Sequence, residues 1–190
     1  MTQKALILAS GSPRRKQLLE ASGLNFTIKT ADICEDYPED LSILDIPIHI
    51  ASNKAKAVAA MSAKEVIILA ADTIVSLNGK VLGKPKDASE AAEYLRLLSG
   101  NTHQVITGVC IYNHLKSEAF SVKTDVHFLE LSESQISYYI EHYKPFDKAG
   151  AYGIQEWIGM IGIDEIHGDY YNVMGLPVSA VCKALADFEL

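Results

Sequence analysis

The N-terminal segment constrains the fold more than any other part of the chain. An apolar run from Lys4 to Ala9 stops at Ser10-Gly11, and a helical pattern then begins at Ser12-Pro13 and ends before Gly23. Ser12 is a good helix N-cap, Pro13 suits the first helical position because no N–H is needed there, and Gly23 suits the position after the helix. The pattern predicts a strand, a tight turn and a helix, which is the repeating unit of α/β folds.

The rest of the chain continues this alternation. Short β-branched or apolar runs predict strands over 25–31, 66–71, 104–112, 121–129 and around 160–166, and a hairpin of 73–77 with 80–82. Periodic segments predict helices over 47–61, 87–99 and 132–142 and from Pro177 onward, and the acidic stretch 32–45 predicts a long loop. Asp87 with Glu90 is typical of a capping box at the start of its helix, and Ser132 begins the next one. We therefore expect an α/β fold with a mixed central sheet flanked by helices, in one domain covering residues 1–190.

Composition and charge exclude several classes of protein. The 190 residues are 48% hydrophobic and 22% charged, as in ordinary globular proteins. The net charge of -7 argues against a nucleic-acid-binding surface, and no apolar run is long enough for a signal peptide or a membrane span. The three cysteines, Cys34, Cys110 and Cys182, show neither zinc-site nor disulfide spacing. A soluble, cytoplasmic protein with no nucleic-acid or membrane partner is expected.

The first candidate site is the segment from Ser10 to Lys16, where the predicted strand becomes a helix. Free backbone N–H groups and the positive end of the helix dipole attract anions at such a place, and the planar fork of Arg14 matches phosphate oxygens. The alternative is that Arg15 and Lys16 are only solvated basic residues.

The second candidate is Asp72, which follows the apolar strand 66–71 and should lie at or near its carboxyl end, where open α/β sheets build their sites. An aspartate there suits a metal ligand or a general base. The alternative is a turn aspartate that caps the next segment. Lys54, Lys84 and Glu35 are each unremarkable alone and gain weight only together with the first two candidates.

Several separate motifs, in order along the whole chain, resemble the Maf family of nucleotide pyrophosphatases, which are related in fold to the inosine triphosphate pyrophosphatases. The matching segments are Leu8-Ala9-Ser10-Gly11-Ser12-Pro13-Arg14-Arg15, Asn53-Lys54-Ala55, Ala71-Asp72-Thr73, Gly83-Lys84-Pro85, Thr107-Gly108, Lys148-Ala149-Gly150-Ala151-Tyr152-Gly153-Ile154-Gln155 and Asn172-Val173-Met174-Gly175-Leu176-Pro177. The resemblance implies two lobes around a cleft, a divalent cation and a homodimer. The site residues that it implies are Ser10, Arg14, Arg15, Glu35, Lys54, Asp72, Lys84 and Gln155, with Asp72 as proton acceptor.

Gln155 and the segment from Asn172 to Pro177 resemble the branch that acts on dTTP and UTP rather than the branch for methylated guanosine triphosphate. Gln155, helped by Thr73, is then expected to select uracil and thymine over cytosine. One departure is visible, because Glu156-Trp157 stands where such proteins commonly have glycine after the glutamine.

The chemistry agrees with this resemblance. Arg14, Arg15, Lys54 and Lys84 with Mg²⁺ or Mn²⁺ would neutralise a departing pyrophosphate, Asp72 would deprotonate the attacking water, and Glu35 would help to hold the metal. Which carboxylate binds the metal is left open, and Glu35 and Asp72 are both candidates. Two other functions compete with this one: a nucleotide-binding regulator of cell division without turnover, and an unrelated α/β phosphatase that releases orthophosphate.

Overall fold

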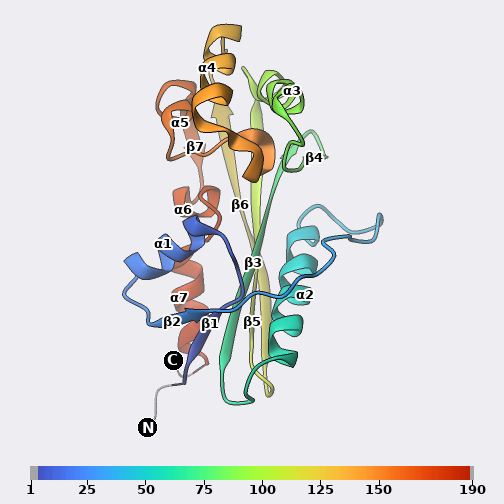
Figure 1. Ribbon diagram of the computed structural model, residues 1–190, viewed down its shortest axis with the longest axis vertical. Coiled ribbons are helices and arrows are strands. Elements are labelled where there is room, and N and C mark those ends of the chain that lie inside the picture. Colours follow the sequence, from blue (N-terminus) through green and yellow to red (C-terminus); the bar gives the residue numbers. More distant parts are fainter. Residues whose placement is uncertain (1–3, 189–190) are drawn as a thin grey trace. The chain divides into compact units, whose positions relative to one another are not determined.

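The computed structural model describes residues 4–188 as a mixed α/β protein built on one sheet with helices beside it (Figure 1). The strands are β1 (Leu6–Leu8), β2 (Phe26–Ile28), β3 (Ile67–Leu77), β4 (Lys80–Leu82), β5 (Thr102–Tyr112), β6 (Ser117–Phe128) and β7 (Ile163–His167). Their order is β2-β1-β3-β5-β6-β7, with β4 paired to β3. Because β1 runs parallel to β2 and β3 while β4 and β7 run antiparallel to their neighbours, the predicted mixed sheet is confirmed.

The chain divides into two compact units. The first contains the residues up to Asp72, the segment Thr107–Val122 and the residues from Gly175 onward, and the second contains Thr73–Ile106 and Lys123–Met174. The boundary falls inside β3, β5 and β6. Two units agree with the two lobes that the family resemblance implies, and the single domain over 1–190 stays a prediction.

The first unit follows the predicted strand, turn and helix. Its helices are α1 (Pro13–Ala21), α2 (Ile46–Ala60) and α7 (Val178–Ala186). Figure 1 shows α2 on one side of β1 and β3 and α7 on the other, which agrees with burial of both alternating sets of side chains along Leu6–Leu8 and Ile67–Ala71. On α2, Ala51, Ala55 and Ala59 recur every fourth residue, so a face of small side chains packs against the sheet.

The second unit contains the hairpin and the remaining helices. Asn78-Gly79 joins β3 to β4 in the predicted two-residue connection. The helices are α3 (Ala88–Leu98), α4 (Glu133–Tyr143), α5 (Trp157–Gly162) and α6 (Tyr170–Val173), with 3-10 turns at Pro145–Asp147 and Ala149–Ala151. The predicted caps are confirmed, since Asp87 accepts from the Glu90 backbone N–H and Ser132 forms a capping box with Gln135.

Two predictions about local structure were wrong. Asp72 does not follow a strand but lies within β3, which continues to Leu77 because its second half pairs with β4. The expected strand around 160–166 begins only at Ile163, since Trp157–Gly162 forms α5. A side chain at Gly159 would lie 1.9 Å from the Ile154 carbonyl oxygen. The glycines that disfavour a helix in isolation therefore allow this one to pack against its own preceding loop.

His103 on β5 is buried in the core of the second unit. Its Nε2 lies 2.7 Å from the Tyr152 hydroxyl, and its ring packs against Phe128. Burial lowers the pKa of His103 to about 4, because the charged ring would lose its hydration, and the charge of Asp125 opposes this only in part. In the unfolded chain the ring titrates near pH 6.5.

The histidine predicts a loss of stability in acid. As the pH falls from about 6.5 to 4 the unfolded state gains a proton that the folded state does not, so the free energy of unfolding should fall by about 3 kcal/mol in total. Urea unfolding of wild type and His103→Gln at pH 7.5 and 4.5 isolates this effect, because other titrating groups are common to both. The advantage of wild type over the variant should shrink by about 2 kcal/mol at the lower pH. A pH-independent difference would contradict the assignment.

Candidate active site

The turn between β1 and α1, with the first turn of α1, contains three predicted site residues: Ser10, Arg14 and Arg15. The Ser10 side chain is buried, and its Oγ accepts hydrogen bonds from the Ser12 backbone N–H (3.2 Å) and from Arg15 Nη1 (3.2 Å). Ser12 caps α1 by accepting from the Arg15 backbone N–H (3.5 Å). The first turn of α1 therefore combines a helix N-terminus with two arginines, as an anion site requires.

Arg15 is a fixed part of this turn rather than a solvated residue, so that alternative was wrong for Arg15. Its Nε donates to the Gly175 carbonyl oxygen at 2.7 Å. Burial lowers the pKa of the Arg15 guanidinium, and the charges of Asp72 and Glu35 oppose that shift. Both carboxylates are thus close enough to interact electrostatically with the Arg15 guanidinium. Lys16, in contrast, is exposed and pairs with Glu20.

Lys54 projects from α2 and bridges two carboxylates that are distant in the sequence. Its Nζ lies 2.7 Å from Asp72 Oδ1 on β3 and 2.6 Å from Glu35 Oε1 in the acidic loop. The side chains of Lys54 and Asp72 are 17% and 13% exposed, whereas that of Glu35 is 47% exposed. One carboxylate is therefore held inside the protein and the other at its surface, by the same ammonium group.

Asp72 lies inside β3. With respect to the parallel strands, however, it has the position that its sequence context predicts. The last parallel pair between β1 and β3 is Leu8 with Leu69, and the Ala9 N–H still donates to the Leu69 carbonyl. Asp72 thus lies just beyond the carboxyl end of β1. The structure brings the first-unit candidates together around this edge: Ser10, Arg15, Glu35, Lys54 and Asp72.

The remaining candidates belong to the second unit. Thr73 follows Asp72 on β3 and is half-buried, while Lys84 is exposed in the loop after β4. The Gly83 carbonyl accepts from the Gly150 N–H at 3.0 Å, which ties the Lys84 loop to the segment that leads to Gln155. Gln155 itself is exposed.

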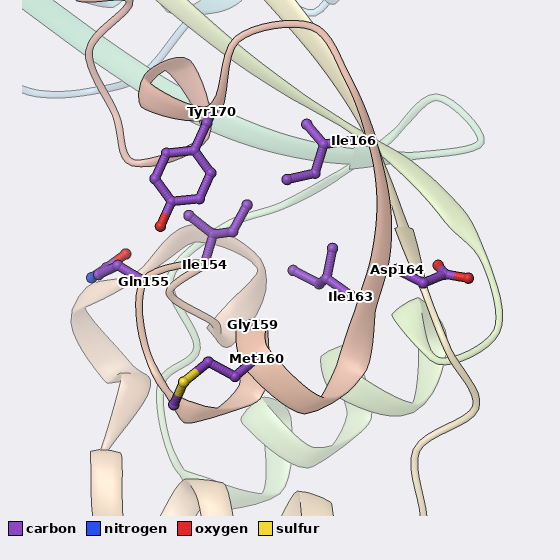
Figure 2. A pocket seen from close by; sticks show the side chains of 8 residues that line it. All are labelled: Ile154, Gln155, Gly159, Met160, Ile163, Asp164, Ile166 and Tyr170. Atoms are coloured by element: carbon purple, nitrogen blue, oxygen red, sulfur yellow. The ribbon is translucent and has the colours of Figure 1, made fainter.

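Gln155 lies at the edge of a pocket in the second unit (Figure 2). The pocket has a volume of about 360 Å³, within the usual range for small-molecule sites. Figure 2 shows the Tyr170 ring extending toward Gln155 above a largely apolar wall. The pocket is lined by Ile154, Gln155, Gly159, Met160, Ile163, Asp164, Ile166 and Tyr170.

A polar network that the sequence does not indicate lies next to Gln155. The Tyr139 hydroxyl donates to Glu156 Oε2, and Lys148 Nζ lies 3.2 Å from Glu156 Oε1 and 2.7 Å from Asp147 Oδ1. The family resemblance includes Lys148 in a motif and marks Glu156 as a departure, but it links neither residue to Tyr139. The helical period of α4 indicates that Tyr139 is buried, but it carries no signal for a partner on a distant loop.

Glu35 and Asp72 are the carboxylates that the sequence predicts as metal ligands, and both contact the Lys54 ammonium group. Within residues 4–188, no group of three or more His, Cys, Asp or Glu is arranged to hold a metal ion. Mg²⁺ is nevertheless commonly held by one or two carboxylates together with substrate phosphates. The donor set therefore fits an ion that arrives with a nucleotide better than a permanently bound one.

Comparison with known proteins adds to this geometry. The family model described as Maf-like protein matches residues 5–188. The chain belongs to the Maf-like family. A dTTP/UTP pyrophosphatase from Cytophaga hutchinsonii is 55% identical over 180 residues, which cover 95% of this chain and 82% of that protein. Proteins with the same name from Phocaeicola vulgatus and Bacteroides fragilis are 52% and 48% identical, each over 95% of this chain and 94% of the relative.

Solved structures show a more distant likeness. A Ham1 protein from Coxiella burnetii aligns with a TM-score of 0.45 and 16% identity over 66% of this chain and 73% of that chain. The Staphylococcus aureus Ham1 protein aligns with a TM-score of 0.44 and 17% identity over 66% and 72%. Membership of the Maf-like family rests on the sequence matches.

Proposed function

We propose that this Maf-like chain is a nucleoside triphosphate pyrophosphatase that hydrolyses dTTP and UTP to the monophosphate and pyrophosphate. The observation that carries the proposal is the bridge from Lys54 to Asp72 and Glu35, close to Arg15 at the start of α1. A carboxylate that can act as a base, close to cations that suit a triphosphate, supports the proposal. The relatives named dTTP/UTP pyrophosphatase support the choice of substrate.

In the proposed mechanism, cationic groups of the chain bind the phosphates. Arg14 and Arg15 lie in the first turn of α1, and Lys54 and Lys84 add ammonium groups that favour charge on the departing pyrophosphate. Asp72 accepts a proton from the water that attacks the α-phosphorus. Because Lys54 contacts Oδ1, we assign Oδ2 of Asp72 to this water.

The metal is part of the proposal. Glu35 and Asp72 offer the hard oxygen ligands that Mg²⁺ and Mn²⁺ prefer. When bound, the ion would neutralise charge on the phosphate oxygens during bond cleavage. Glu35 is the more exposed of the two carboxylates, so an ion bound there would not require a buried side chain to move.

Chelation should therefore abolish activity. Excess EDTA is expected to reduce pyrophosphate release from dTTP and UTP to the uncatalysed level, and Mg²⁺ or Mn²⁺ added beyond the chelator should restore it, because several phosphate charges would otherwise be uncompensated. Full activity in excess EDTA would rule out the metal. Thermal melting with and without EDTA serves as the control that the fold is unchanged.

Product analysis tests the function itself. Chromatography of reactions with dTTP, UTP, CTP and purine nucleotides should show monophosphate and pyrophosphate in equal amounts. Diphosphate with orthophosphate would instead indicate an α/β phosphatase. Binding without any turnover would favour a nucleotide-binding regulator of cell division. Asp72 argues for turnover, since an acidic group beside a bound triphosphate repels it unless metal or proton transfer is involved.

Base selection is assigned to Gln155 and Thr73. Uracil and thymine present an N3–H donor next to the O4 acceptor, whereas cytosine has an acceptor at N3 and an amino donor. A glutamine amide in a fixed orientation accepts from N3–H and donates to O4, and it mismatches cytosine at both positions. A buried polar mismatch of this kind discriminates by about 10- to 150-fold.

The location and the oligomeric state of the protein are two further predictions. No helix among residues 4–188 is long and apolar enough to cross a membrane. The cytoplasmic location and the homodimer implied by the family resemblance stay predictions, and light scattering coupled to gel filtration measures the oligomeric state directly.

A further inference from the structure

Glu156 is tied to two other elements of the second unit. It immediately precedes α5, and its two carboxylate oxygens have different partners. Oε2 accepts a hydrogen bond from the Tyr139 hydroxyl of α4, and Oε1 lies 3.2 Å from Lys148 Nζ. Tyr139 is fully buried, and the Lys148 side chain is only 8% exposed. Side chains packed this tightly hold the carboxylate in one position.

The same network holds the backbone on the other side of Gln155. The Tyr139 hydroxyl accepts from the Gly153 N–H at 3.0 Å. Burial raises the pKa of Tyr139, and the hydrogen bond and charge of Glu156 raise it further. The hydroxyl therefore stays protonated, and its O–H donates a hydrogen bond to Glu156. The Glu156 N–H in turn donates to the Gly153 carbonyl at 3.0 Å. Gly153 and Glu156, the two residues that flank Ile154 and Gln155, are thus fixed to one phenol.

The Gln155 side chain packs on this fixed segment. A Cβ atom at Gly153 would lie 3.1 Å from Gln155 Nε2 and 2.9 Å from Glu156 Cδ. The amide of Gln155 and the carboxylate of Glu156 therefore both lie over the bare backbone of Gly153. A change in the position of Glu156 alters the surface against which the amide rests.

We propose that Glu156, together with Tyr139 and Lys148, is a positioning group that fixes the orientation of the Gln155 amide and so sets the preference for uracil and thymine over cytosine. The inference rests on the proposed function. Its physical basis is that rotation of the amide by half a turn exchanges its donor and acceptor ends, which would remove the preference. Glu156 therefore fixes the orientation of the side chain that contacts the base, Gln155.

Selectivity separates this role from a merely structural one. A variant that only lowers the folded fraction reduces kcat/KM for UTP and CTP by the same factor, so their ratio does not change. Glu156→Ala should lower the ratio of kcat/KM for UTP to kcat/KM for CTP by at least about 5-fold. This is part of the 10- to 150-fold discrimination expected from the amide contact. Tyr139→Phe keeps the buried ring but removes the hydroxyl, and it should narrow the ratio in the same direction.

A double-mutant cycle tests whether the effect passes through Gln155. In a Gln155→Ala background, adding Glu156→Ala should leave the ratio unchanged, because no amide remains to be positioned. Asp147→Ala is the matched control, since it also removes one carboxylate from Lys148 but lies in the turn Pro145–Asp147, before the Gln155 segment. It should leave the ratio at the wild-type value. An unchanged ratio in both Glu156→Ala and Tyr139→Phe, or no wild-type discrimination at all, would overturn the inference.

Hydrogen exchange gives a readout that does not depend on activity. Backbone amides of residues 149–158 should exchange faster in Glu156→Ala and Tyr139→Phe than in wild type or Asp147→Ala. Tyr139→Phe removes the acceptor of the Gly153 N–H, and Glu156→Ala removes the carboxylate that holds this acceptor in place. Equal exchange in all four proteins would refute the positioning role even if the enzyme is active. Absence of pyrophosphate release from wild type is a different result, which refutes the proposed function, and the exchange rates then decide the positioning role alone.

Discussion

Replacing Asp72 with asparagine should lower kcat for pyrophosphate release from UTP by at least about 100-fold, equivalent to about 2.7 kcal/mol. Asparagine has nearly the same shape, and its side-chain oxygen can still accept from Lys54 Nζ, which lies 2.7 Å from Asp72 Oδ1. What it loses is the charge and the ability to accept a proton from water. Steady-state kinetics at saturating UTP measures the effect.

Two controls define the role of Asp72. Asp125→Asn removes the charge of another strand aspartate, one that pairs with Lys123, and it should leave kcat near wild type. Repeating the Asp72→Asn assay at increasing Mg²⁺ separates a base from a metal ligand, since only a weakened metal site is restored by more metal. Near wild-type turnover in folded Asp72→Asn protein would remove Asp72 from the mechanism.

Replacing Lys54 with methionine should cause a loss of similar size, at least about 100-fold in kcat/KM. The substitution keeps an unbranched side chain on α2 but removes an ammonium group that contacts both Glu35 and Asp72. Without it the two carboxylates repel each other, and the phosphates lose a cation, so both the base and the binding site are disturbed. We expect kcat and KM to be affected together.

Lys56→Met is the matched control, because Lys56 lies two residues further along α2 and is exposed. It removes the same charge and should leave kcat/KM within about 2-fold of wild type, as surface substitutions usually do. Melting temperatures of both variants show whether the folded state persists. Equal activity of the two variants would mean that the bridge has no role in turnover.

Local sequence patterns predicted much of the fold. Ser12 with Pro13 marks the start of α1, Asn78-Gly79 joins β3 to β4, and Ser132 caps α4, each as expected. These features depend on hydrogen bonds and backbone preferences of residues that are close in the chain, so the sequence contains them directly. The mistakes arose where distant contacts decide, as in α5, where Gly159 packs on Ile154.

The site was predicted in its residue types but not in its contacts. Motif resemblance identified Glu35, Lys54 and Asp72, yet no spacing in the sequence indicates that one ammonium group bridges the two carboxylates. The network of Glu156, Tyr139 and Lys148 is a stronger example of contacts that the sequence does not indicate. Tyr139 has the burial pattern of an ordinary core tyrosine. Lys148 belongs to a family motif, but the resemblance does not imply it as a site residue.

The sequence by itself determined most of the order of strands and helices, the helix caps, the turn at Ser12 and the family of the chain. These features depend on residues that are neighbours or on motifs read one at a time. Only the tertiary structure decided which charges meet. Ion pairs such as Lys54 with Glu35 and Asp72, and hydrogen bonds such as Tyr139 with Glu156, join residues from separate elements. Coulombic and hydrogen-bond energies depend on distances of a few ångströms in space, and those distances exist only after the sheet and its helices have packed.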